Sequence, residues 1–134
     1  MSLTFDFIGI VTRDLAASLA FYRTLGLDLA EGLESEPHVE VELPSGVRIG
    51  WDPIETIHSF DPEYAFPTGD HRVAFGFQAA DAAEVDATHA RLVAAGHPSR
   101  VDPWDAPWGQ RYATVLDPDG NAIDLYAPLA VAAD

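Results

Sequence analysis

The sequence predicts an α+β fold in which one structural unit occurs twice. Each half of the chain begins with a strand-like segment, continues into an amphipathic helix and ends in short alternating segments. The corresponding first strand, helix and last strand are 3–11, 15–25 and 47–51 in the first half, and 72–77, 82–95 and 122–126 in the second. A repeat of about 60 residues indicates two copies of one module. Two half-sheets facing each other would enclose a cleft, where we expect the function to lie.

The length of 134 residues is most simply explained by one domain containing both modules. The apolar content of 48% argues against disorder. We expect the following organisation: module one at 1–52, a linking loop at 53–70, module two at 71–128 and a tail at 129–134.

The first helix has a start signal and a stop signal. Asp14 is suited to cap its N-terminus, because a carboxylate accepts hydrogen bonds from the first free backbone N–H groups. Apolar residues then recur at helical spacing, at Leu15, Leu19, Tyr22 and Leu25. Gly26 follows where a left-handed residue would end the helix.

The second helix follows the same logic. Asp81 is its predicted cap, and Glu84 stands three residues later, as in a capping box. Val85, His89 and Leu92 form its stripe, and Gly96 and Pro98 end it.

The other segments read as strands, turns and loops. Residues 38–43 alternate strictly between polar and apolar, which predicts an antiparallel strand with one solvated face. The segments 44–46 and 117–120 contain Pro and Gly and predict turns. Two stretches read as irregular: 52–70, which holds three prolines, and 102–109, which holds two of the three tryptophans.

Composition narrows the possible partners. The net charge is −15, and all seven basic residues are arginine. Such a surface repels nucleic acids and anionic lipids, and it favours cationic ligands if the acids gather near a site. No apolar run is long enough to span a membrane, no secretory signal is visible, and there is no cysteine. We therefore expect a cytoplasmic protein with no nucleic-acid or membrane partner.

Several of these segments resemble a known family. The opening at 7–15, the segment 21–27, the stretch Pro107–Arg111 and the turn Asp117–Asn121 are similar to the vicinal oxygen chelate superfamily. This superfamily contains glyoxalase I, extradiol dioxygenases and bleomycin resistance proteins, and the ending is most like the bleomycin resistance branch. The resemblance implies two tandem βαβββ modules that form a cup-shaped mixed sheet with helices on its outer face. It also implies a homodimer.

Enzymes of this superfamily hold a divalent metal with His, Gln or Glu at four equivalent strand positions. The resemblance places these positions at Phe7, Gly50, Arg72 and Asp124 of this chain. Phe7 and Gly50 supply no ligand atom, and Arg72 is a permanent cation. One carboxylate does not make a site for a hard divalent ion, so we expect no metal and no other cofactor.

Seven residues are candidates for ligand binding. Phe7 would line the cup, and three tryptophans would offer faces for stacking or for cation–π contact. Arg72 and Asp124 would either form a salt bridge in the vacated metal position or anchor a ligand. His71 directly precedes Arg72, where the resemblance places a metal ligand, and neighbouring residues of a strand point to opposite faces. The candidate set is Phe7, Trp51, His71, Arg72, Trp104, Trp108 and Asp124. The other four histidines show no convergent spacing.

The sequence thus favours a metal-independent binding protein for a small aromatic or cationic molecule, similar to the proteins that sequester antibiotics and so confer resistance. The alternative is a metal-dependent lyase, isomerase or dioxygenase of the glyoxalase type. A third possibility is a metal-free enzyme in which His71 or Asp124 acts as general base.

Overall fold

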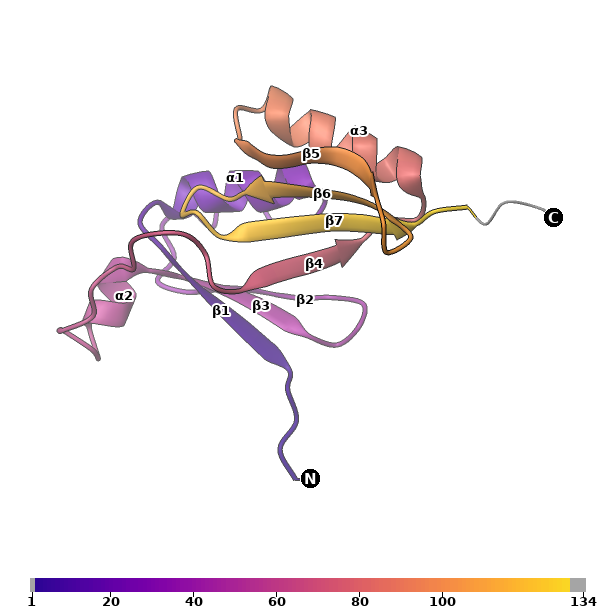
Figure 1. The fold of residues 1–134 in the computed structure, drawn as a ribbon. Helices are drawn as coiled ribbons and strands as arrows, with labels where there is room; N and C mark the ends of the chain where they lie inside the picture. Colours follow the sequence, from indigo (N-terminus) through magenta and orange to yellow (C-terminus); the bar gives the residue numbers. More distant parts are fainter. Residues whose placement is uncertain (1, 131–134) are drawn as a thin grey trace. The chain divides into compact units, whose positions relative to one another are not determined.

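The computed structural model of this protein describes residues 2–130 and divides the chain between Thr68 and Gly69 into two units (Figure 1). The α+β class is confirmed, because a sheet of three strands and a sheet of four strands are each accompanied by helices. The predicted tail at 129–134 lies mostly outside the described residues. Among residues 2–130, no helix combines the length and the apolar character needed to cross a bilayer.

Residues 2–68 of unit one form three strands and two helices. In chain order these are β1 (Phe7–Thr12), α1 (Leu15–Leu25), β2 (Val39–Glu42), β3 (Arg48–Pro53) and α2 (Ile54–His58). The strand order is β1-β3-β2, in which β1 runs parallel to β3 and β2 runs antiparallel to it. The first and last strands of the unit therefore lie side by side.

Unit two repeats this plan with one more strand. Its elements are β4 (Ala74–Gln78), α3 (Ala82–Ala94), β5 (Ser99–Ala106), β6 (Gln110–Leu116) and β7 (Ala122–Pro128). The order is β4-β7-β6-β5, and again the first strand runs parallel to the last. Figure 1 shows α3 lying along one face of this sheet.

The capping predictions are confirmed. Asp14 accepts a hydrogen bond from the backbone N–H of Ala17, and Gly26 ends α1 at a φ of 125°. Asp81 accepts from the N–H of Glu84, whose side chain reaches back to the N–H of Ala80. Both helices therefore begin and end within one residue of the predicted positions.

Unit one lacks a counterpart of β5. The segment between α1 and β2 is irregular, and it contains four acidic residues, Gly32 and Pro37, which disfavour a strand. Arg23 holds this segment in place by donating hydrogen bonds to the carbonyl oxygens of Leu29 and Ala30 and to the Glu34 carboxylate.

Three segments differ from the sequence prediction. The first strand begins at Phe7 instead of residue 3. The linking loop contains the short helix α2, and the guanidinium of Arg13 lies 3.9 Å from the ring centre of Phe66 later in that loop. The stretch 102–109, predicted to be irregular, is largely strand β5, whose pairing with β6 is interrupted by bulges. Bulges tolerate Pro103 in a way that a regular central strand does not.

The core of unit one is centred on Trp51. Its ring packs edge-on against Tyr22 of α1, with ring centres 5.2 Å apart. Both side chains are fully buried, and the indole Nε1–H has no hydrogen-bond partner. In unit two, α3 packs on the sheet and its buried residues Val85 and Leu92 belong to the core, together with Ala113, Val115, Ile123 and Leu125.

Replacing Trp51 by alanine should destabilise the protein by about 3–5 kcal/mol, because it leaves a large cavity beside Tyr22. Trp51→Phe should cost much less, since it also removes the unpaired buried N–H. Urea denaturation measures both values. Trp108→Ala is the control: this side chain is 57% exposed, and its loss should cost about 1 kcal/mol or less. Equal losses at positions 51 and 108 would contradict the assignment of Trp51 to the core.

Candidate functional site

The functional candidates of unit two lie on the sheet face opposite α3. Arg111 of β6 points to the helix side, where its guanidinium pairs with Asp86 of α3 at 2.9 Å. Side chains alternate along a strand, so the neighbouring Tyr112 and Thr114 belong to the series on the other face. Asp124 of β7 is the cross-strand partner of Thr114 and lies on that same face.

Asp124 is held by two hydroxyl groups. Thr114 Oγ1 donates a hydrogen bond to Oδ1 at 2.7 Å, and the Tyr112 hydroxyl donates to Oδ2. Burial, and then the hydrogen bond to Asp124, raise the pKa of Tyr112 to about 12. The phenol therefore stays protonated at physiological pH and remains the donor, which fixes the carboxylate in one orientation.

Aromatic rings form a row beside this carboxylate. The cross-strand register aligns Trp104 of β5, Tyr112 of β6 and Tyr126 of β7. Trp108, in the turn between β5 and β6, contacts both Trp104 and Tyr112, with ring centres 5.5 Å apart in each pair. Trp104 is 40% exposed and Trp108 is 57% exposed, so large indole faces are open to solvent.

A glycine makes room for the last ring of the row. A Cβ at Gly76 of β4 would lie 3.3 Å from Cε1 of Tyr126. The hydrogen of glycine lets the Tyr126 ring lie close to the neighbouring strand. Sequence analysis identified Trp104, Trp108 and Asp124 but missed Tyr112, Thr114 and Tyr126. The alternation of β6 and β7 around Asp124 was the signal that would have found them.

The equivalent face of unit one is closed by an aromatic ring. A Cβ at Gly50 would lie 2.7 Å from Cζ of Phe7 and 3.1 Å from Cε1 of His38. The Phe7 ring therefore occupies the space that a side chain at position 50 would need. The guanidinium carbon of Arg48 lies 5.3 Å from the centre of the same ring.

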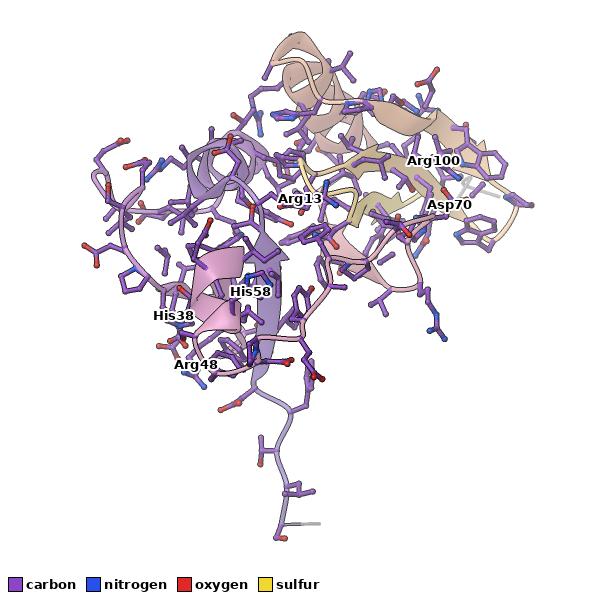
Figure 2. All side chains as sticks on the ribbon, turned by 90° about the vertical axis from the view of Figure 1, so that its left-hand side faces the viewer. Arg13, His38, Arg48, His58, Asp70 and Arg100 are labelled. Carbon is purple, nitrogen blue, oxygen red and sulfur yellow. The ribbon has the colours of Figure 1, made fainter. Side chains whose placement is uncertain are left out.

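His38 was missed by sequence analysis and belongs to a row of charges on this face. Its Nδ1 lies 2.6 Å from Asp52 Oδ1, and its Nε2 lies 3.2 Å from Glu40 Oε1. Glu40 in turn pairs with Arg48 at 3.1 Å. Figure 2 labels His38 and Arg48 in this part of unit one. The hydrogen bond to Asp52, and then that to Glu40, raise the pKa of His38, while partial burial opposes them. The spacing of one histidine gives no sign of this arrangement, because Asp52 comes from another strand.

Three of the predicted site residues are not where the sequence placed them. Trp51 was predicted to stack on a ligand, and this is wrong because the side chain is fully buried against Tyr22. Arg72 was assigned to the strand position equivalent to Phe7, but β4 begins only at Ala74. The parallel pairs Gly9–Gly50 and Gly76–Asp124 make Ala74 the equivalent of Phe7. His71 and Arg72 lie in the exposed segment before β4, so their ligand-binding roles stay predictions without structural support.

The four strand positions to which the resemblance assigns metal ligands do not fit a divalent ion in this chain. Phe7, Gly50 and Ala74 have no ligand atom in their side chains. Asp124, at the fourth position, already accepts a hydroxyl group on each oxygen. Within residues 2–130, no three His, Cys, Asp or Glu side chains gather as a metal site.

Comparison with known proteins assigns the family. The sequence profile of the Glyoxalase/Bleomycin resistance protein/Dioxygenase superfamily matches residues 4–125. The chain belongs to this superfamily. Membership confirms the resemblance seen in the sequence, but the match does not single out the bleomycin resistance branch. Among curated protein sequences, none matches the chain significantly.

Solved structures of superfamily members have the same fold. A glyoxalase/bleomycin resistance protein/dioxygenase from Nocardioides is 27% identical with a TM-score of 0.76, and the match covers 98% of this chain and 87% of that one. A family enzyme from Burkholderia phytofirmans PsJN is 22% identical with a TM-score of 0.81, covering 95% of this chain and 100% of that one. A lactoylglutathione lyase from Agrobacterium tumefaciens is 24% identical with a TM-score of 0.67, covering 92% of each chain.

Two histidines should titrate on opposite sides of the ordinary value of 6.5. The carboxylates of Asp52 and Glu40 raise the pKa of His38, whereas burial lowers the pKa of His97 against a weaker opposing effect of Asp117. The ring-proton NMR signals of the two side chains, followed from pH 5 to 9, give both values. Asp52→Asn should lower the pKa of His38 and leave that of His97 unchanged.

The raised pKa of His38 also makes part of the folding stability depend on pH. Because protonation is favoured in the folded state, its contribution is complete below the unfolded pKa of about 6.5 and is lost as pH rises through the folded value. A stability difference between wild type and Asp52→Asn that grows from pH 6 to pH 9 would contradict the assignment.

Proposed function

We propose that this protein binds a small cationic molecule with an aromatic part, without a metal, on the face of unit two opposite α3. The observation that carries the proposal is Asp124, a half-buried carboxylate that two hydroxyl donors fix beside four aromatic rings. A binding site needs apolar contact area and a few polar anchors, and this face has both.

The charge of the protein supports a cationic ligand. The net charge of −15 raises the local concentration of cations around the whole surface. Near the rings, Asp124 adds a negative charge that is partly shielded from water. A cation over an exposed indole gains on the order of 1 kcal/mol, and about 2 kcal/mol when water is excluded. The two effects act together on one ligand.

Metal independence is supported by the residues at the four expected ligand positions, three of which have no donor atom. A glyoxalase-type lyase or dioxygenase needs the metal to polarise substrate oxygens. Antibiotic sequestration, by contrast, requires binding alone, and we propose it as the biological use of this face. The homodimer implied by the resemblance stays a prediction.

Binding of 9-aminoacridine, a planar aromatic cation, should quench the tryptophan fluorescence of the protein. Acridine-9-carboxylate, which has the same rings and a negative charge, should bind much more weakly. Trp104→Ala should weaken 9-aminoacridine binding by about tenfold, because one exposed stacking face is lost. Trp51→Phe is the matched control and should bind normally. Equal binding of both acridines, or no binding of either, would overturn the proposal.

Added metal should not change the melting temperature of the protein. Chelator-treated protein should keep its melting temperature within about 1 °C when Zn²⁺, Ni²⁺ or Mn²⁺ is added at tenfold excess, since ligand binding to the native state alone would raise it. Elemental analysis of protein purified without chelator should show no stoichiometric metal. A metal-induced rise in melting temperature that disappears in Asp124→Asn would favour the metal-dependent enzyme instead.

A further inference from the structure

The aromatic rings of unit two meet at right angles. The planes of Trp104 and Trp108 are inclined by 89°, and those of Trp108 and Tyr112 by 80°. A flat ligand stacks on one ring face at a time. A compact, roughly spherical cation placed in a right-angled corner can contact two ring surfaces at once. The geometry therefore favours a small rounded cationic group over a flat one.

The carboxylate of this face already has two donors. Each oxygen of Asp124 accepts a hydroxyl group, from Thr114 or from Tyr112, which leaves about one acceptor site on each oxygen. Trp108 Nε1–H donates to Gln110 Oε1 at 2.9 Å, so that amide oxygen is also in use. A primary ammonium carries three N–H donors, and each needs an acceptor once water is removed. A cation without N–H groups has no such requirement.

The negative charge at the corner comes from Asp124. Asp102 and Asp105 flank Trp104 in the sequence but pair with groups of the α3 side, His89 and Arg111 respectively. Arg111, the nearest arginine in sequence, points to that side as well, where its guanidinium is also bound to Asp86. A ligand with a net positive charge is therefore attracted to the corner by Asp124, whereas the negative group of a zwitterion is repelled by it.

We propose that the corner formed by Trp104, Trp108 and Tyr112 binds a quaternary ammonium group with net positive charge, of which choline is the simplest example, with Asp124 as its counter-charge. This inference rests on the proposed function and names the cationic group of its ligand. It also states a selectivity: methylated nitrogen is preferred over a primary amine of the same chain length.

Three small molecules test the selectivity. Choline has the charge and the methyl groups, ethanolamine has the charge without the methyl groups, and 3,3-dimethyl-1-butanol has the shape of choline without the charge. Their affinities are measured from tryptophan fluorescence and from the chemical shifts of the Trp104 and Trp108 indole N–H signals. Choline should bind about tenfold or more tightly than either of the others.

Variants locate the site. Trp108→Ala should reduce the preference of the protein for choline over ethanolamine to about twofold or less, because Trp108 makes both right-angled ring contacts, with Trp104 and with Tyr112. Asp124→Asn should weaken the binding of choline and leave the binding of 3,3-dimethyl-1-butanol unchanged. Val93→Ala, at a partly exposed position on α3, is the control and should behave as wild type. Circular dichroism confirms that each variant is folded.

The outcomes separate this inference from the proposed function. If 9-aminoacridine binds but choline binds no better than ethanolamine or 3,3-dimethyl-1-butanol, the quaternary ammonium inference is wrong and the proposed function stands. A choline preference that survives Trp108→Ala also overturns it, since the selectivity then arises elsewhere. If no cation binds, both fail.

Discussion

The pairing of strands within each unit, and above all the parallel pairing of its first and last strand, determines which strand residues share a sheet face. A parallel pair needs a crossover connection, and here the helix and the intervening strands supply it. In unit one the pairing sets Gly9 beside Gly50, and in unit two it sets Gly76 beside Asp124. Residues 41 and 48 positions apart in the chain, respectively, thereby share one sheet face. A shift of one residue in either pair would turn the site residues to the other face.

The two parallel strand pairs hold different side chains at equivalent positions. In unit one, glycine occupies the last-strand position, and the ring of Phe7 fills the space above it. In unit two, the same position holds Asp124, and hydroxyl groups from β6 satisfy its oxygens. A glycine on the first strand leaves room for the Tyr126 ring. Of the four positions where the resemblance places metal ligands, Phe7 carries a ring that also fills the space at Gly50, and Ala74 has no donor atom. This lack of donor atoms is the physical basis for proposing binding without a metal.

The polar groups on these faces are paired among themselves before any ligand arrives. Asp52, His38, Glu40 and Arg48 form a row of alternating acidic and basic groups in unit one. Asp124 has its two hydroxyl donors in unit two. Such pairing makes it costly to remove a partner and reduces the gain from adding another hydrogen-bonding group. What remains available to a ligand on unit two is aromatic surface and net negative charge. For the proposed ligand, this condition makes charge and shape the main features by which it would be recognised.

The sequence by itself determined the repeat, the helix limits and the family. These features are local: Asp14 and Asp81 cap the helices, Gly26 ends one of them, and the turn at 117–120 has its own signature. Local signals survive because the groups that create them are neighbours in the chain. They also placed Asp124 on the last strand, because it follows a recognisable turn, whereas Trp104 and Trp108 were assigned to an irregular stretch and to no sheet face.

Only the tertiary structure decided which face each strand residue occupies and what it meets there. Trp51 directly follows Gly50 in β3. Because side chains alternate along a strand, Trp51 points to the opposite face and into the core. Arg72 does not lie at the strand position predicted for it, because β4 starts two residues later than the sequence pattern indicated. Tyr112 and Asp124 come from different strands, and His38 directly precedes β2 whereas its partner Asp52 lies on β3, so both contacts depend on register. Register is set by long-range pairing and by burial of one face, neither of which a local pattern contains.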